Sequence, residues 1–200
     1  MYFGQSLPRR EDNRFLRGKG VFTDDICFPD MTYMAFVRSP HSHALIKKVN
    51  TDQSKSVKGV IQSFSITDWR KDGMGELVCV HPMPFSNGAP MNEKLRPIFA
   101  EKKVCHVGDV VACVVAETRN EALNGAEAIE VEYESLEPVT SVEKSLDENV
   151  PIIHQELGSN IVFEVNKGDS VATTEVFKNA EHLTSMTLVS NRVAGNPMEP

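Results

Sequence analysis

The most regular pattern of hydrophobic and polar positions lies between residues 104 and 134. Residues 109–117, DVVACVVAE, are apolar throughout their interior, which predicts a strand buried on both faces. Thr118 with Glu121 three positions later predicts a capping box at the start of a helix. Residues 128–136, AIEVEYESL, then alternate apolar and acidic positions, as a second strand does. We therefore expect a strand–helix–strand block of the βαβ type.

The helix of this block carries a narrow stripe of small residues. Ala122, Ala126 and Ile129 follow one another at i, i+4 and i+7, which favours close packing on a sheet. Gly125 costs about 1 kcal/mol of helix propensity relative to alanine, so we expect another part of the chain to pass very near it. The turn before the helix lacks the glycine fingerprint of a dinucleotide site, and no nucleotide is indicated.

Upstream of this block, the patterns are shorter. Residues 32–39 and 43–51 predict two strands paired across a turn at Ser39-Pro40, and residues 59–65 predict a third strand. Between residues 71 and 97, glycine and proline interrupt every pattern, and loops of such length are uncommon unless they contact something. His81 lies in this loop, and we interpret it as a surface residue rather than a catalytic one.

The C-terminal region predicts three more elements. Residues 160–170 favour a strand and turn, residues 169–180 a helix, and residues 181–193 a long alternating strand. The sequence then stops at GNPMEP with nothing behind this strand to pair with it. Because a domain rarely ends on an unpaired strand, we expect the sequence to be cut inside a second domain.

The composition is that of an ordinary globular protein, with 40% apolar and 24% charged residues. A net charge of −7 and the lack of a Lys/Arg stripe argue against a nucleic-acid partner. The longest apolar run, VVACVVA, is far short of the ~20 residues that cross a bilayer, and the start lacks the order of a secretory signal. We expect a soluble, cytoplasmic protein with no membrane span.

Residues 38–43, RSPHSH, raise the possibility of a metal site. On an extended strand His41 and His43 would leave the same face of the sheet, so their spacing permits chelation. A zinc or iron site needs a third and usually a fourth ligand, and the sequence offers none at a recognisable spacing. A structural or solvated pair is the favoured interpretation, and half of a metal site is the alternative.

The cysteines give no sign of a cluster or a reactive thiol. They are scattered and form no C-x-x-C pair, which argues against zinc ribbons and iron–sulfur ligation. Cys105 and Cys113 lie in apolar surroundings and are predicted to act as small buried hydrophobes. No helix start or basic cluster flanks them to lower a thiol pKa.

Four stretches of the sequence are distinctive when taken together and in order: PRREDNRFLRGKGVFTDDI, MAFVRSPHSHALI, HVGDVVACVVAETRNEALNGAEAIEVEYESLEPV, and NIVFEVNKGD with the terminal PMEP. They resemble the molybdenum hydroxylases, a family that includes xanthine dehydrogenase, aldehyde oxidase and aerobic carbon monoxide dehydrogenase. The resemblance is to the molybdopterin-binding large subunit and covers nearly the whole chain.

The resemblance implies an α+β fold with a defined domain order. Residues 1–17 would form an N-terminal arm, 18–139 an α/β hammerhead domain, 140–158 a linker, and 159–200 the truncated start of a molybdopterin-binding domain. The complete subunit would bind molybdopterin, the molybdenum cofactor, with [2Fe–2S] clusters and FAD held in partner subunits or domains. The implied partners are an iron–sulfur subunit and an FAD subunit, assembled as a homodimer of heterotrimers.

The resemblance assigns no catalytic, cofactor-binding or metal-binding residue to this chain. In the family, the residues around the molybdenum centre lie downstream of the PMEP motif, where this sequence ends. Glu199 is therefore interpreted as a structural part of a strand end, and RSPHSH as a turn that is ordered by its own side chains or meets a neighbouring domain. Asn13 and Asp109 depart mildly from the family pattern, without consequence for chemistry.

Two functions follow from these observations. The first is the N-terminal fragment of a molybdenum-dependent hydroxylase or dehydrogenase large subunit, with a structural and assembly role for this part. The complete enzyme would oxidise xanthine, an aldehyde or carbon monoxide, whereas the fragment alone would lack the catalytic residues. The alternative is a stand-alone, non-catalytic hammerhead interaction module, which a stop codon directly after residue 200 in the native gene would favour.

Overall fold

The computed structural model describes residues 3–190, which fall into two units. The larger unit runs from Thr32 to Ala172. The smaller unit comprises residues 1–31 and 173–200, of which 3–31 and 173–190 are described.

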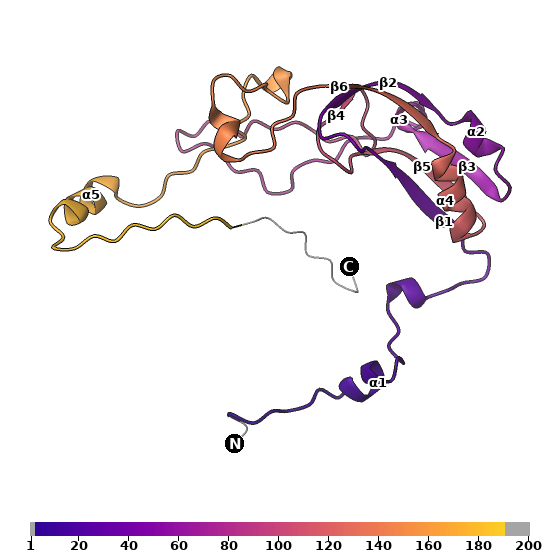
Figure 1. Ribbon diagram of the computed structural model, residues 1–200, viewed down its shortest axis with the longest axis horizontal. Helices are drawn as coiled ribbons and strands as arrows, with labels where there is room; N and C mark the ends of the chain where they lie inside the picture. Colours follow the sequence, from indigo (N-terminus) through magenta and orange to yellow (C-terminus); the bar gives the residue numbers. More distant parts are fainter. Residues whose placement is uncertain (1–2, 191–200) are drawn as a thin grey trace. The chain divides into compact units, whose positions relative to one another are not determined.

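The described part of the larger unit contains two three-stranded sheets (Figure 1). The first has the order β1-β5-β3, from β1 (Tyr33–Arg38), β5 (Val110–Ala116) and β3 (Val60–Ser65). The second has the order β4-β2-β6, from β4 (Lys103–Val104), β2 (Ala44–Asn50) and β6 (Glu130–Ser135). Every pairing is antiparallel, and helices accompany the sheets, so the α+β class is confirmed.

The pairing differs from the one expected from sequence. The strands β1 and β2 are not partners, because Tyr33 pairs with Ala116 on β5 whereas Ala44 pairs with Ser135 on β6. The chain crosses between sheets at Ser39, whose N–H donates to the Asp109 carbonyl and whose carbonyl accepts from the Gly108 N–H, both at 2.8 Å. The expected hairpin is therefore wrong. The βαβ expectation is wrong as well, since β5 and β6 belong to different sheets.

The strand β5 forms the centre of the larger unit. Val111, Ala112, Val114 and Ala116 have no exposed surface. Ala112 and Val114 pack with Ile129, whereas Cys113 points the other way, into a second cluster. The predicted burial of this strand on both faces is confirmed.

The helix α4 (Arg119–Glu127) lies against β1 and β5 (Figure 1). Thr118 caps it, with the Glu121 N–H donating to the Thr118 hydroxyl at 3.3 Å. The Glu121 carboxylate accepts from the Thr118 hydroxyl at 2.8 Å instead of from a backbone N–H, so only half of the predicted capping box forms. A Cβ on Gly125 would lie 2.7 Å from Val60 Cγ2 and 2.8 Å from Val114 Cγ1. The close approach predicted at Gly125 is thus confirmed, because two strands touch the helix there.

Two short helices complete the covering of the sheets. The helix α2 (Asp52–Lys55) contributes Ser54, whose buried hydroxyl lies 2.7 Å from that of Ser63 on β3. The helix α3 (Ile66–Lys71) begins after Ser65, whose N–H donates to the Asp68 carboxylate at 2.8 Å.

The glycine- and proline-rich loop forms a defined structure with residues 161–166. Leu77 and Arg96 make an isolated antiparallel bridge at the base of the loop. Farther along, the Ser86 N–H donates to the Glu164 carbonyl at 2.9 Å, and the Asn92 N–H donates to the Val162 carbonyl at 2.8 Å. We call residues 77–96 together with 161–166 the clasp. Residues 161–166 are not a strand, so that expectation is wrong, but they run along the loop.

The region after β6 is largely irregular. It contains two single 3-10 turns, η2 (Glu143–Leu146) and η3 (Gln155–Leu157), followed by α5 (Ser170–Lys178), which confirms the predicted C-terminal helix. Residues 181–190 form no strand, contrary to expectation, and the rest of that predicted strand, with Glu199, lies outside the described residues. Within residues 3–190, no helix has the length and hydrophobicity to cross a membrane.

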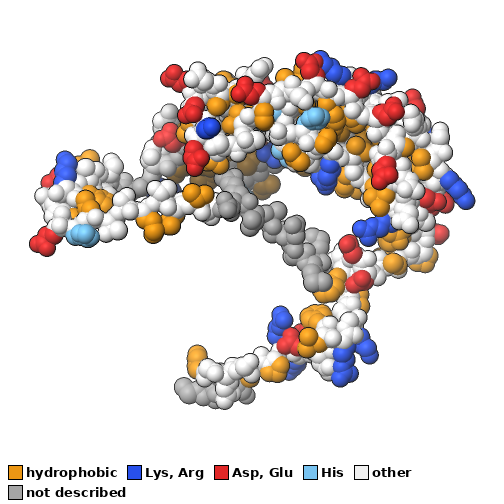
Figure 2. All heavy atoms as spheres, viewed as in Figure 1, with side chains coloured by type: hydrophobic (Ala, Val, Ile, Leu, Met, Phe, Trp, Pro, Cys, Tyr) orange, Lys and Arg blue, Asp and Glu red, His pale blue; other side chains and the backbone are white. Residues whose placement is uncertain are grey.

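The smaller unit holds α1 (Asp12–Leu16) and the 3-10 turn η1 (Thr23–Asp25). The rings of Phe15 and Phe22 stack with centroids 5.9 Å apart. Gly18 has φ of 66°, consistent with the turn predicted there. Figure 2 shows Lys and Arg side chains gathered around α1.

Candidate functional site

Hydrogen bonds from its backbone and from its own side chains fix the turn at residues 38–43. Beyond the two bonds at Ser39, the Arg38 guanidinium donates to the Gly108 carbonyl at 2.9 Å. The Ser39 hydroxyl donates to the His41 carbonyl and accepts from the His41 N–H, both at 3.0 Å. These bonds close the turn on itself and on the loop before β5, which is the ordering role predicted for RSPHSH.

His43 is a buried structural residue with one free ring nitrogen. The residue is 6% exposed, and Nδ1 lies 2.7 Å from the Glu137 carbonyl, so Nδ1 carries the proton and donates it. The Leu136 N–H donates to the His43 carbonyl at 2.9 Å. Nε2 is buried and has no hydrogen-bond partner among the described residues. The ring and the backbone carbonyl of His43 therefore both bond to the residues that directly follow β6.

His41 has separate partners. Its ring lies against Tyr133 with centroids 4.9 Å apart and an interplanar angle of 55°, and its Nδ1 is 3.4 Å from the Ser135 hydroxyl. Residues 39–43 form bends rather than a strand, so the premise that both rings leave one face of an extended strand does not hold. Within residues 3–190, no three His, Cys, Asp or Glu side chains are grouped so that they could hold a metal ion.

The thiols near this turn are not activated. Burial raises the pKa of the Cys105 thiol, and burial followed by the Asp68 charge raises the pKa of the Cys113 thiol. Burial also raises the pKa of Tyr133. A nucleophilic thiol needs a lowered pKa, so neither cysteine offers one. His81 is exposed in the loop, as predicted.

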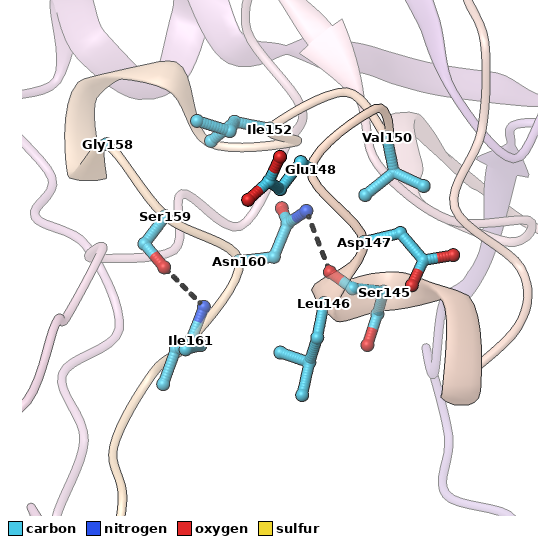
Figure 3. A pocket seen from close by; sticks show the side chains of 10 residues that line it. All are labelled: Ser145, Leu146, Asp147, Glu148, Val150, Ile152, Gly158, Ser159, Asn160 and Ile161. Carbon is cyan, nitrogen blue, oxygen red and sulfur yellow. Dashed lines mark hydrogen bonds between the residues drawn. The ribbon is translucent and has the colours of Figure 1, made fainter.

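A shallow hollow of about 180 Å³ lies between residues 145–152 and 158–161 (Figure 3). Asn160 organises it: its amide oxygen accepts from the Ile153 N–H at 3.0 Å, and its amide nitrogen donates to the Pro151 carbonyl at 3.1 Å and to the Ser145 carbonyl at 3.4 Å. These bonds close the irregular region on itself. Sequence reasoning missed Asn160, because a single asparagine in a polar segment carries no distinguishing signal.

Beside this hollow, charged groups surround His154. Burial, then the Lys94 charge, lowers the pKa of His154, and its buried Nδ1 has no partner among the described residues. Lys94 forms an ion pair with Glu156, and this hydrogen bond lowers the pKa of Glu156 to about 2. Both partners are partly exposed, so solvent screens the pair and its contribution to stability is small.

A family model described as "Aldehyde oxidase and xanthine dehydrogenase, a/b hammerhead domain" matches residues 17–137. This region, with its two antiparallel sheets and the capped helix α4, is thus an α/β hammerhead domain. The chain belongs to the aldehyde oxidase and xanthine dehydrogenase family of molybdenum hydroxylases, in agreement with the sequence resemblance.

Individual relatives extend the similarity along the chain. The carbon monoxide dehydrogenase large chain of Afipia carboxidovorans is 30% identical over 98% of this chain and 24% of its own length. A probable hypoxanthine oxidase of Escherichia coli O157:H7 is 32% identical over 76% of this chain and 15% of its own. The nicotinate dehydrogenase large molybdopterin subunit of Eubacterium barkeri is 28% identical over 98% of this chain and 42% of its own.

Solved structures of related enzymes are similar to this chain as well. Reconstituted CO dehydrogenase from Oligotropha carboxidovorans superposes with a TM-score of 0.70 at 29% identity, over 90% of this chain and 22% of that chain. Quinoline 2-oxidoreductase from Pseudomonas putida 86 gives a TM-score of 0.66 at 31% identity, over 80% of this chain and 19% of that one. The chain therefore spans about a quarter or less of the length of most of these relatives.

Proposed function

We propose that this chain is part of the large subunit of a molybdenum-dependent hydroxylase or dehydrogenase and has a structural and assembly role there. One observation carries the proposal. The hammerhead match stops at residue 137, whereas the similarity to the carbon monoxide dehydrogenase large chain covers 98% of the sequence. A stand-alone hammerhead would have no reason to resemble a large subunit beyond the hammerhead.

The complete protein would oxidise xanthine, an aldehyde or carbon monoxide. Molybdopterin in the same subunit would supply the two-electron chemistry, with [2Fe–2S] clusters and FAD held by partner subunits or domains. We assign no reaction step to residues 3–190. The histidines of the turn are engaged with backbone and Tyr133, and the thiols nearby are not activated, so these side chains do not fit a cofactor site.

The proposal includes an iron–sulfur subunit and an FAD subunit as partners, a homodimer of heterotrimers and a cytoplasmic location. These follow from the family resemblance. Within the described chain, the larger unit supplies a compact α+β body, and both the N–H and the carbonyl of Ser39 are hydrogen-bonded where the chain crosses between its sheets, which suits an assembly role.

The test begins with the DNA beyond codon 200 and the adjacent genes. We expect a continuing frame with glycine-rich pterin loops, flanked by genes for an iron–sulfur and an FAD subunit. The complete frame, expressed with those genes, should contain molybdenum and oxidise carbon monoxide, an aldehyde or xanthine. A frame that ends at residue 200 without such neighbours would refute the proposal in favour of a stand-alone interaction module.

A further inference from the structure

The clasp displays apolar side chains that the described residues leave uncovered. On its loop, Leu77, Val78 and Val80 are 58%, 65% and 78% exposed. On the segment that runs along the loop, Val162 and Phe163 are 46% and 44% exposed. Single exposed apolar residues are ordinary, but a concentration of them on one ordered feature marks an interaction surface.

The same loop is free of charge. Residues 77–92 contain no Lys, Arg, Asp or Glu, and this is the longest uncharged stretch in a chain with 24% charged residues. A loop that only contacts water has no reason to lack charged residues. The buried centre of a protein–protein interface, in contrast, is depleted of charged residues.

Hydrogen bonds within the clasp also tie its loop together. The bridge between Leu77 and Arg96 closes its base, and the Cys79 N–H donates to the Glu93 carboxylate at 2.7 Å. At its tip, the Phe85 N–H donates to the Ala89 carbonyl at 2.8 Å. An apolar surface that is ordered before binding loses less entropy when it docks.

We propose that the clasp is the docking surface for the polypeptide that follows residue 200 in the same large subunit. The inference rests on the proposed function. The chain covers 24% of the length of the carbon monoxide dehydrogenase large chain, so most of such a subunit lies outside it. Residues 161–166 belong to the clasp, and residues 167–200 are all that separate them in sequence from a polypeptide that follows residue 200. A tether of this kind raises the effective concentration of the following part at the clasp above that of any separate subunit.

Cys79 provides a native reporter, because its thiol is exposed and lies between Val78 and Val80. The measurement is the rate of Cys79 alkylation by iodoacetamide, followed by peptide mass spectrometry, in the 200-residue chain and in the complete large subunit. We expect alkylation to be at least about tenfold slower in the complete subunit, as for a site that reacts only through local opening.

Two variants make the test specific. The double variant Val78→Asp/Val80→Asp should restore fast alkylation in the complete subunit while leaving the urea midpoint of the 200-residue chain unchanged. Val107→Asp is the matched control, since Val107 is 64% exposed but lies outside the clasp, and it should leave alkylation slow.

Several results would overturn the inference. Equal alkylation rates in the chain and in a molybdenum-loaded, active complete subunit would do so while leaving the proposed function intact. Protection that appears only after another subunit is added would name a different occupant. Protection of the 200-residue chain that grows with its concentration would indicate a second copy. A gene that ends at residue 200 would remove both the occupant and the proposed function.

Discussion

Replacing Gly125 with alanine tests the close contact between α4 and the sheet. The new Cβ would lie 2.7 Å from Val60 Cγ2 and 2.8 Å from Val114 Cγ1. Carbon atoms prefer roughly 3.5–4.0 Å, so the helix or the strands would have to move by roughly 1 Å. Val114 is fully buried in the central strand, which leaves little freedom for it to move away.

Two effects of opposite sign decide the outcome. Alanine gains about 1 kcal/mol of helix propensity over glycine. Overpacking costs roughly 1–3 kcal/mol, and we take the upper end because both neighbours are β-branched and belong to different strands. The free energy of unfolding should therefore fall by about 2 kcal/mol, which lowers the Tm of a domain of this size by roughly 4–8 °C.

Urea unfolding measures this change through the single tryptophan. Trp69 packs edge-on against Phe99 in the larger unit, so its fluorescence reports loss of that packing. Asn124→Ala is the matched control, because Asn124 is exposed on the same helix and its replacement gains about 0.5 kcal/mol of propensity without a clash. If Gly125→Ala raised the urea midpoint as the control does, the contact geometry would be wrong.

Three further predictions concern the cap, pH and metal. Thr118→Ala should lower the free energy of unfolding by about 1 kcal/mol through loss of the helix cap, and an unchanged urea midpoint would contradict it. Because burial lowers the folded pKa of His154 below its ordinary 6.5, the unfolded chain binds more protons there, and stability should fall as pH drops through 6.5. His154→Gln should reduce this decline in the urea midpoint between pH 7.5 and 5.5, whereas the exposed control His81→Gln should not; equal slopes would refute the assignment. Elemental analysis of the purified chain should find no stoichiometric molybdenum, zinc or iron, and one equivalent lost in His41→Ala/His43→Ala would overturn our account of the turn.

Features of the fold that are determined by neighbouring residues could be predicted from the sequence. The apolar run of β5 and the Thr118 cap depend on residues close together in the chain. A glycine inside a helix, such as Gly125, indicates a position with no space for a side chain. Sheet pairing could not be predicted in this way. Ser39-Pro40 suggests a hairpin, but the partner of β1 is β5, which lies far along the sequence. Nothing in residues 32–51 specifies that choice.

The candidate site shows the same division. The sequence favoured a structural or solvated histidine pair in RSPHSH, but the hydrogen bond that holds the His43 ring is made with Glu137, which is distant in sequence. The hydrogen bonds of Asn160 and the clasp also join residues that share no pattern. Such contacts are set by tertiary packing, so composition and periodicity alone do not indicate them.

The central position of β5 affects how the protein emerges from the ribosome. Both β1 and β3 pair with β5 and not with each other, so neither has its partner when it is made. At roughly 5–20 residues per second, the interval between synthesis of Arg38 and Val110 is on the order of 4–14 s. During that interval the apolar side chains of β1, joined later by those of β3, have no sheet to pack into. Cotranslational binding by a chaperone should therefore concentrate on nascent chains from which residues 110–116 have not yet emerged from the ribosome.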